Sequence, residues 1–413
     1  MVVHSQHMTN GSPFSILSGD TGSPSALVSG PAPKITSLLI KPASAVCNLD
    51  CEYCFYLDRE ADPYKDLPAR RMTLDTLERL VDTYLFYSYP NATFAFQGGE
   101  PTLAGLDFFT KLVEFQQRFG RDGQNVSNAL QTNGVLLDKD WCQLFRAYNW
   151  LIGISIDGPE EVNDLYRFNR AGHGTWKKVM QGIETMQKEK VDFNVLCVLS
   201  QSNVHKPKEI YKFFRGLGLD FMQFIPLSEF HPDGTPMPFT ITPDEYGRFM
   251  CEVFELWWPE RRKVRVRFFD NLAEALAGQK PGSCTMHETC DSYVVVEYNG
   301  DIYPCDFFVE KEWKLGNVNL DSWSEISRRV RRYNFAAKKT LAHPECQVCE
   351  YQSICHGGCP KSRHGQNRKF EDLDYFCQAY KMIFAKAVGP LREEVKKLLG
   401  HAADLTPHSI SPY

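Results

Sequence analysis

Three cysteines near the N-terminus stand close enough together to share one inorganic cluster. Cys47, Cys51 and Cys54 form a C-x3-C-x2-C segment that directly follows an apolar run typical of a strand. Three thiolates on one short loop can ligate three irons of a 4Fe–4S cube, which normally takes four cysteines. The fourth iron is then open to a cofactor or substrate, and the ring of Tyr53 within the loop can pack on an adenine. A zinc site is the alternative, although zinc prefers four ligands in paired C-x2-C units.

Eight further cysteines gather in the last third of the chain: Cys284, Cys290, Cys305, Cys346, Cys349, Cys355, Cys359 and Cys377. They suffice for two fully ligated 4Fe–4S clusters or for two zinc sites, and their spacing does not divide them into sets. The other three of the fourteen, Cys142, Cys197 and Cys251, stand alone among apolar neighbours and are expected to be small buried side chains. Clustered cysteines in a long chain without a secretion signal predict metal or redox chemistry in a reducing cytoplasm.

Polar residues follow two other predicted strands. Gly98, Gly99 and Glu100 come after the second strand, where the glycines leave the backbone bare and the carboxylate can receive an ammonium group. A tight turn is the alternative interpretation of that motif. Ser155 ends the fourth strand and can donate to a carboxylate, with which Arg167 can form an ion pair. Taken singly, these last two are typical of surface positions.

The elements that would position these residues alternate between strands and helices, which predicts a parallel β/α sheet. The expected strands are Ser37–Ile40, Thr93–Gln97, Val126–Gln131, Leu151–Ile156, Asn194–Leu199 and Phe221–Ile225. The expected helices are Thr73–Tyr87, Asp107–Gln117, Lys139–Ala147, Trp176–Lys188 and Lys206–Arg215. This segment is shorter than the roughly 250 residues of a closed eight-fold barrel, so the pattern favours a partial (β/α)6 barrel, with working residues after the strands.

The chain changes character beyond this segment. A loop over 228–241 and a helix at Pro243–Trp257 lead to a hairpin pattern, in which Asn299-Gly300 predicts a type I′ turn. We therefore expect five parts: a disordered leader or cloning remnant (1–34), the barrel core (35–240), a helical connector (241–283), a cysteine-rich module (284–380), and a C-terminal helix and tail (381–413).

Bulk composition indicates an ordinary soluble globular protein. The 413 residues carry a net charge of −5, so neither nucleic acid nor an anionic membrane is expected as a partner. An apolar run of 18 or more residues is absent, and the leader lacks the apolar stretch of a signal peptide.

The cysteine patterns resemble a known superfamily. The C-x3-C-x2-C loop resembles the signature of the radical S-adenosylmethionine (SAM) enzymes, and the C-terminal cysteines resemble their SPASM module. The resemblance implies that SAM chelates the open iron and is cleaved to methionine and a 5′-deoxyadenosyl radical, which abstracts a hydrogen atom. It also implies two auxiliary 4Fe–4S clusters, and thus three in all. Their implied ligand sets are Cys284, Cys290, Cys305 and Cys359 for the first, and Cys346, Cys349, Cys355 and Cys377 for the second.

Four segments narrow the resemblance to anaerobic sulfatase-maturating enzymes: Leu39–Ser44, Phe94–Gly105, Leu130–Gly134 and Tyr303–Asp306. It extends from Thr36 to Lys397 and implies oxidation of a Cys or Ser in a sulfatase to Cα-formylglycine. The implied partners are an unfolded or nascent sulfatase segment and a flavodoxin- or ferredoxin-type electron donor. Asp306 is the implied general base. The SAM contacts implied by position are Tyr53, Gly99, Ser155, Arg167 and Leu227. Gly98 and Glu100 are also expected to bind SAM, as parts of the motif at its amino group.

Two other functions are compatible with the cysteines. A radical SAM enzyme that introduces a thioether or carbon crosslink into a ribosomally made peptide would share both cysteine groups. A non-catalytic iron–sulfur or zinc-binding module would not require the β/α segment.

Overall fold

The computed structural model describes residues 34–57, 62–67, 71–291, 293–333, 335–341, 343–363 and 369–403. Apart from residue 34, the predicted leader lies outside these residues, and so do residues 404–413 of the predicted tail.

One ten-stranded sheet runs through the described residues, in the order β10-β9-β8-β1-β2-β3-β4-β5-β6-β7. The strands that carry the predicted core are β1 (Ser37–Lys41), β2 (Asn91–Phe96), β3 (Asn125–Thr132), β4 (Leu151–Ser155), β5 (Phe193–Leu199) and β6 (Phe221–Pro226). All six are parallel to their neighbours. The predicted partial barrel is confirmed, because among the described strands no pairing joins the two ends of this order.

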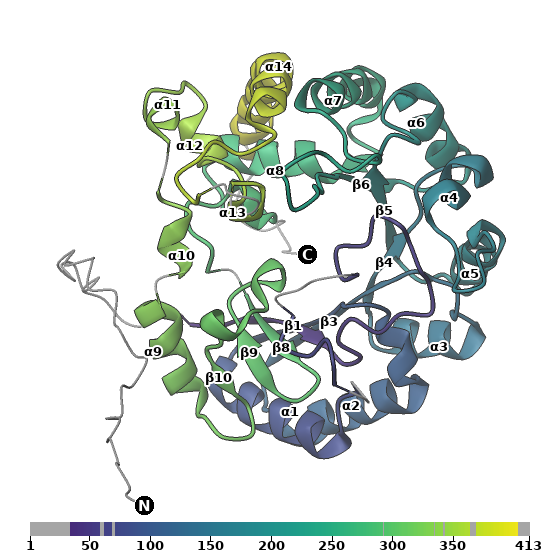
Figure 1. Ribbon diagram of the computed structural model, residues 1–413, viewed down its shortest axis with the longest axis vertical. Coiled ribbons are helices and arrows are strands. Elements are labelled where there is room, and N and C mark those ends of the chain that lie inside the picture. The colour runs from purple at the N-terminus through teal and green to yellow at the C-terminus, as the bar shows by residue number, and fades with distance from the viewer. Residues whose placement is uncertain are drawn as a thin grey trace, which may run out of the picture. The chain divides into compact units, whose positions relative to one another are not determined.

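Helices alternate with these strands and lie outside the curved sheet (Figure 1). They are α1 (Leu74–Ser88), α2 (Leu106–Phe119), α3 (Lys139–Ala147), α4 (Glu160–Tyr166), α5 (Trp176–Glu189) and α6 (Pro207–Gly216). Each longer helix has an apolar face on the sheet; in α2 this face includes the fully buried Phe109 and Leu112. The side chain of Asp138 caps α3 by accepting from the backbone N–H groups of Asp140 and Trp141. Sequence patterns located five of these helices and missed α4, which is only seven residues long.

The predicted connector contains two helices, α7 (Pro243–Trp257) and α8 (Arg267–Leu276). Between them the short strand β7 (Arg265–Val266) adds to the sheet beside β6, which the sequence patterns did not predict. The long helix α14 (Cys377–Ala403) packs on α7 and α8, where Gly247 provides the space for Met382. None of the helices in the described ranges is both long enough and apolar enough to cross a membrane.

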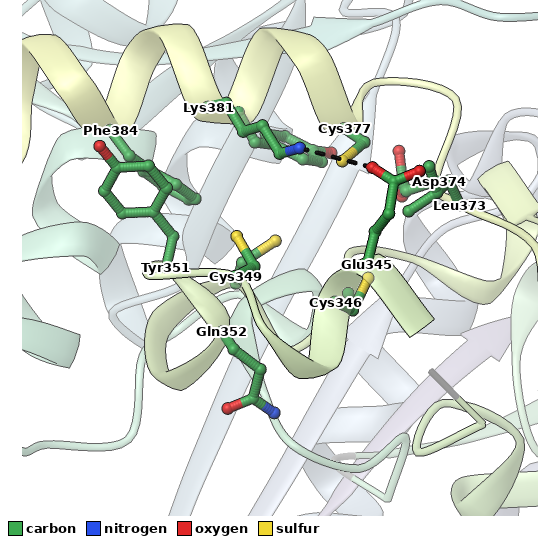
Figure 2. Close-up of a pocket in the computed structure, with 13 residues that line it drawn as sticks. Glu345, Cys346, Cys349, Tyr351, Gln352, Leu373, Asp374, Cys377, Lys381 and Phe384 are labelled. Atoms are coloured by element: carbon green, nitrogen blue, oxygen red, sulfur yellow. Dashed lines mark ion pairs between the residues drawn. The ribbon is translucent and has the colours of Figure 1, made fainter. Parts of the chain in front are cut away.

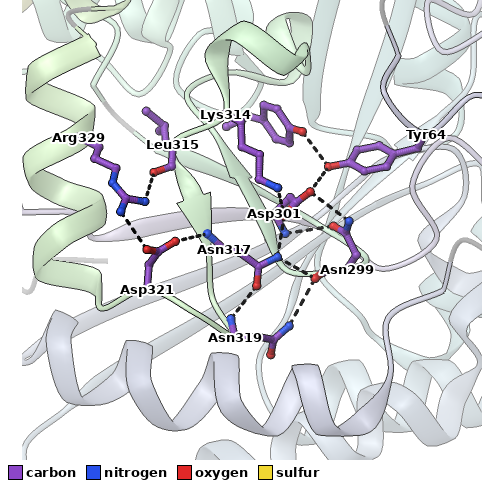
Figure 3. Close-up of polar contacts among 10 residues, drawn as sticks. Tyr64, Asn299, Asp301, Lys314, Leu315, Asn317, Asn319, Asp321 and Arg329 are labelled. Atoms are coloured by element: carbon purple, nitrogen blue, oxygen red, sulfur yellow. Dashed lines mark hydrogen bonds and ion pairs between the residues drawn. The ribbon is translucent and has the colours of Figure 1, made fainter.

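The hairpin β8 (Val294–Glu297) and β9 (Asp301–Tyr303) belongs to the same sheet as the barrel strands. Strand β8 pairs in parallel with β1, so that Lys41 is in register with Glu297. The two-residue strand β10 (Gly316–Asn317) then pairs with β9. Figure 3 shows how polar side chains fix this end of the sheet: the carboxylate of Asp301 accepts from Asn317 at 2.6 Å and pairs with Lys314 at 2.6 Å. The cysteine-rich region is therefore joined to the barrel by backbone hydrogen bonds.

The turn of this hairpin differs from the predicted type I′ turn. A type I′ turn requires positive φ at both central residues, but Gly300 alone has one (φ 84°). The N–H of Gly300 donates to the carbonyl of Glu297, so Tyr298 and Asn299 occupy the centre of the turn. This is the three-residue hairpin loop, in which a left-handed glycine follows an ordinary turn. The prediction was wrong because the same Asn-Gly pair suits either loop.

Candidate active site

The loop with the three N-terminal cysteines follows β1 and is held by backbone contacts from two directions. The N–H groups of Asp50 and Glu52 donate to the carbonyls of Phe168 and Tyr166, both at 2.9 Å. The guanidinium of Arg170 donates to the carbonyl of Cys47 at 2.7 Å. The segment that follows α4 thus clamps the cysteine loop from one side.

Gly98 and Gly99 hold the loop from the other side. The N–H of Gly99 donates to the carbonyl of Ser44, and the N–H of Glu100 donates to that of Val46, both at 2.8 Å. A Cβ atom on Gly99 would lie 2.2 Å from the carbonyl oxygen of Val46, and one on Gly98 would lie 2.5 Å from that of Ser44. The two glycines are therefore required because two backbones pack directly on each other next to Cys47.

The carboxylate of Glu100 is completely buried and its hydrogen bonds come from the protein. One oxygen accepts from the backbone and hydroxyl of Thr102 and from the hydroxyl of Thr132, and the other accepts from the N–H of Asn133 at 2.7 Å. Glu100 thereby holds Asn133, whose amide lies 3.7 Å from the Cys47 sulfur. In this conformation Glu100 positions the loops, and its predicted contact with SAM stays a prediction.

Tyr53 and Arg167 lie together in a buried network. The hydroxyl of Tyr53 donates to the carboxylate of Asp157 and accepts from Arg167 at 2.9 Å. The Nε atom of Arg167 is buried and has no hydrogen-bond partner among the described residues. Although burial lowers the pKa of Arg167, the neighbouring Tyr53, Cys51 and Asp157 raise it well above its usual range, so the side chain stays charged. A buried cation with an unused donor is suited to the carboxylate of a ligand.

Leu227 and Ser155 come from the ends of two strands in the same part of the sheet. Leu227 follows β6 and packs with Tyr53 and Phe239 in a small apolar cluster. Ser155 is the last residue of β4 and is half-buried. The structure therefore brings Leu227 to Tyr53, while the predicted contact of Ser155 with a cofactor stays a prediction.

The three thiols suit a cationic inorganic group. Burial raises the pKa of Cys47 to about 12 and that of Cys51 to about 11, so bare thiolates would be unfavourable here. Positively charged irons would stabilise the thiolates, and Arg167 also acts on Cys51 and Cys54 in this sense. Each of the fourteen cysteines is a free thiol. Of the three isolated cysteines, Cys142 and Cys197 are buried as expected, whereas Cys251 is only half-buried against the core.

The first C-terminal quartet consists of Cys284, Cys290, Cys305 and Cys359. All of these except Cys305 act electrostatically on the ammonium of Lys339, which is almost completely buried. This ammonium donates to the carbonyls of Cys284 and Thr285 at 2.8 and 2.9 Å. Burial raises the pKa of Cys290 to about 12, Lys339 lowers it, and the nearby thiols of Cys359 and Cys284 raise it further. The thiols of Cys359 and Cys284 also raise the pKa of Cys305. Cys290 and Cys305 are thus both within electrostatic reach of Cys284 and Cys359.

The second C-terminal quartet, Cys346, Cys349, Cys355 and Cys377, lines one pocket (Figure 2). Cys377 begins helix α14. Cys346 and Cys355 lie in the short helices Pro344–Gln347 and Gln352–Cys355, and Cys349 lies in the loop between them. The grouping of both quartets is the one that the resemblance implies, although the ligand roles themselves stay predictions. No three His, Cys, Asp or Glu side chains of the described ranges are placed so that they could hold a single metal ion.

Asp374 connects the two quartets. Its buried carboxylate accepts from the N–H of Cys359 at 2.8 Å and from the N–H of Phe376 at 2.7 Å. Cys359 belongs to the first quartet, and Phe376 directly precedes Cys377 of the second quartet. Asp374 therefore fixes the two cysteine groups relative to each other.

Asp306, the predicted base, follows Cys305 and is buried. One carboxylate oxygen accepts from the hydroxyl of Tyr56, and the other lies 3.2 Å from the ammonium of Lys41. The negative charge of Asp306 also acts on Cys54 of the N-terminal loop. Asp306 thus lies between the N-terminal cysteines and the first C-terminal quartet.

Several residues of this site were missed by sequence reasoning: Lys41, Tyr56, Asn133, Asp157, Lys339 and Asp374. Asp157 and Asn133 lie in segments that were already singled out, directly after β4 and β3. Lys41 could have been singled out because it is a charged residue at the end of an apolar strand. Lys339 and Asp374 gave no comparable signal, because their partners are distant in sequence.

Comparisons with known proteins agree with this geometry. The radical SAM superfamily model matches residues 42–214, and the SPASM model, an iron–sulfur cluster-binding domain, matches residues 284–350. The chain is thus a radical SAM enzyme with a SPASM module that binds iron–sulfur clusters.

A serine-type anaerobic sulfatase-maturating enzyme of Bacteroides thetaiotaomicron is 37% identical over 374 residues, which is 86% of this chain and 90% of that protein. A cysteine-type enzyme of Clostridium perfringens is 36% identical over 350 residues, or 84% and 94%. The chain belongs to the family of anaerobic sulfatase-maturating enzymes.

Solved structures show the same relationship. The structure of native anSMEcpe with bound AdoMet and Cp18Cys peptide has a TM-score of 0.81 and 36% identity, and the match covers 88% of this chain and 99% of that one. SuiB of Streptococcus suis bound to S-adenosylmethionine has a TM-score of 0.58 at 16% identity, over 84% and 78% of the two chains. The second likeness concerns the fold alone.

The close packing at Gly99 leads to a testable expectation. Gly99→Ala places a methyl group against the carbonyl of Val46 and should displace the cysteine loop, whereas Gly216 has open space at its Cβ position. We expect the Gly99→Ala protein, reconstituted anaerobically, to lose about four irons and SAM cleavage, because the cluster that these cysteines are predicted to hold contains four irons. Gly216→Ala should retain both. Wild-type iron content and SAM cleavage in Gly99→Ala would contradict the role assigned to this contact.

Proposed function

We propose that this enzyme oxidises a Cys or Ser side chain in an unfolded or nascent sulfatase segment to Cα-formylglycine. The observation that carries the proposal is the position of Asp306, a buried carboxylate between the N-terminal cysteine loop and the first C-terminal quartet. The printed names of the relatives, both serine-type and cysteine-type sulfatase-maturating enzymes, support it.

The oxidation removes one hydrogen atom, one proton and one electron from the target side chain. When bound, SAM and the N-terminal cluster supply abstraction of the hydrogen atom at Cβ. Asp306 accepts the thiol or hydroxyl proton, which becomes much more acidic once the Cβ hydrogen is lost. The first C-terminal quartet, which includes Cys305 directly before Asp306, would hold a cluster able to accept the electron. A Ser side chain then becomes the aldehyde directly, whereas a Cys side chain becomes a thioaldehyde that water converts to the aldehyde with release of hydrogen sulfide.

The residues around the N-terminal loop are assigned to cofactor binding. Cys47, Cys51 and Cys54 would hold three irons of the first cluster, and Arg167 would pair with the carboxylate of SAM through its unused Nε donor. Gly98 and Gly99 would form the part of the SAM site beside the cysteine loop. Ser155 and Leu227 would be further contacts of SAM. The ring of Tyr53 is buried in one apolar cluster with Leu227 and Phe239, and its packing on the adenine is part of the proposal.

The two quartets would carry one 4Fe–4S cluster each, which makes three in the enzyme. Four cysteine ligands per cluster leave no iron open, which suits electron transfer and not substrate chelation. A flavodoxin- or ferredoxin-type protein is the proposed electron donor. Eleven cysteines proposed as ligands of three oxygen-sensitive clusters, and three further thiols, support a reducing cytoplasm as the compartment.

The second candidate is the introduction of a thioether or carbon crosslink into a ribosomally made peptide. It uses the same two cysteine groups, so the clusters do not separate the two functions. The identity with sulfatase-maturating enzymes over nearly the whole chain favours formylglycine formation.

The product distinguishes the two functions. A peptide with a Cys-x-Pro-x-Arg motif, incubated anaerobically with SAM and a reductant, should lose about 18 Da, and its Ser counterpart about 2 Da if that residue is accepted. Mass spectrometry after treatment with a hydrazide measures both the loss and the aldehyde, and deoxyadenosine should form in about equal amount. Loss of about 2 Da from the Cys peptide without an aldehyde would instead indicate crosslinking.

The role of Asp306 is tested by Asp306→Asn, which keeps the shape of the side chain and removes its basicity. General bases contribute roughly 10²–10⁴-fold, so formylglycine formation should fall by about that factor. Iron content and SAM cleavage should be retained, as measured by iron analysis and chromatography of deoxyadenosine. Near wild-type product formation would exclude Asp306 as the base, and loss of iron would assign it a structural role.

A further inference from the structure

A buried ion cluster lies behind the proposed base. The ammonium of Lys41 is 2.7 Å from Glu297 Oε1 and 3.2 Å from Asp306 Oδ1. The side chains of all three residues are at most 4% exposed. Two carboxylates and one ammonium therefore share a volume from which water is excluded.

Such a cluster is costly to bury, so its geometry must be specific. Charges taken out of water lose several kcal/mol of solvation each, which their attraction offsets only when they are closely placed. Lys41 is also held from a third direction, because its ammonium lies 4.7 Å from the centroid of the Tyr56 ring. Tyr56 in turn donates its hydroxyl hydrogen to the other oxygen of Asp306. The carboxylate of Asp306 is thus held at both oxygens.

The sheet determines where these charges stand. Lys41 is the last residue of β1, directly before the loop that leads to Cys47. Glu297 is the last residue of β8 and is in register with Lys41 across the parallel β1–β8 pair. Asp306 follows β9, the antiparallel partner of β8. The ion cluster therefore forms where the strand of the N-terminal cysteine loop meets the hairpin that leads to Cys305.

We propose that Lys41 and Glu297 are positioning residues for Asp306. Lys41 fixes the direction of the Asp306 carboxylate, and Glu297 fixes Lys41 from the neighbouring strand. The inference rests on the proposed function, since it assigns a role through the proposed base. Neither residue contacts the substrate in this assignment.

The test removes Lys41 and Glu297 together, because the loss of one positive and one negative charge leaves the net charge of the cluster unchanged. Lys41→Met alone would leave two buried carboxylates without their cation, so the informative variant is Lys41→Met/Glu297→Met, which keeps similar volumes. The measured quantity is the amount of formylglycine formed per deoxyadenosine released, because a purely structural change would not alter this ratio while the clusters are intact. We expect the ratio to fall at least about tenfold, since small displacements of a reacting group cost up to about 10²-fold. Iron content and SAM cleavage should match the wild type.

A second comparison tests whether the pair acts through Asp306. In an Asp306→Asn background the same double substitution should have no further effect on the ratio, because the group that it positions is already lost. An additional loss in that background would overturn the proposal. So would an unchanged ratio in the double variant with full iron content.

If the double variant loses iron, Glu297→Gln tests the same role of Glu297 with a smaller change. It retains the shape of Glu297 and weakens its hold on Lys41 by about 1 kcal/mol, the difference between charged and neutral hydrogen bonds, so the ratio should fall about fivefold. An unchanged ratio in that variant would overturn the proposal. Failure of the proposed function is recognised separately, because the wild-type enzyme would then form no formylglycine at all.

Discussion

The parallel pairing of β1 with strands on both of its sides is the constraint on which the rest of the site depends. Strand β1 pairs with β2 on one side and with β8 on the other, and its Leu38 and Ile40 side chains are fully buried. The cysteine loop follows its last residue. Strand β2 leads to Gly98 and Gly99, and β8 leads to the hairpin before Cys305. Strand β1 therefore aligns the two glycines, the cysteine loop and the proposed base with one another. A shift of β1 by one residue would turn its buried side chains to the opposite face of the sheet.

Two buried ionic networks contact the cysteine loop and fix the positions of the side chains around it. On one side Tyr53 joins Asp157 to Arg167, and on the other Tyr56 joins Asp306 to Lys41. In both networks a tyrosine from the loop itself donates to a carboxylate from outside it. Buried charges with several partners hold fixed positions, so groups near the reacting atoms need little rearrangement during the reaction. Burial also raises the pKa of the Cys47 and Cys51 thiols, so their thiolate forms require a cationic partner.

Much of this architecture was predictable from local patterns. Six apolar runs with intervening amphipathic segments were sufficient for β1 to β6, because parallel strands buried on both faces leave a clear signal. The cysteine spacing and the Gly98-Gly99-Glu100 motif located the site. What sequence patterns did not reveal depends on contacts between distant residues. The pairing of β8 with β1, the ammonium of Lys339 beside Cys284, and the full set of protein donors around Glu100 are of this kind. The hairpin turn was mispredicted for a different reason, since Asn299-Gly300 is compatible with two loop lengths.

We propose that the strands and loops built on β1 direct hydrogen abstraction to Cβ of a peptide side chain, with Asp306 beside it. The most direct measurement is deuterium transfer to deoxyadenosine from peptides labelled either at Cβ or at Cα of the target Cys. We expect deoxyadenosine to acquire deuterium from the Cβ-labelled peptide and none from the Cα-labelled one. Transfer from the Cα position, or product formation without transfer from Cβ, would contradict it.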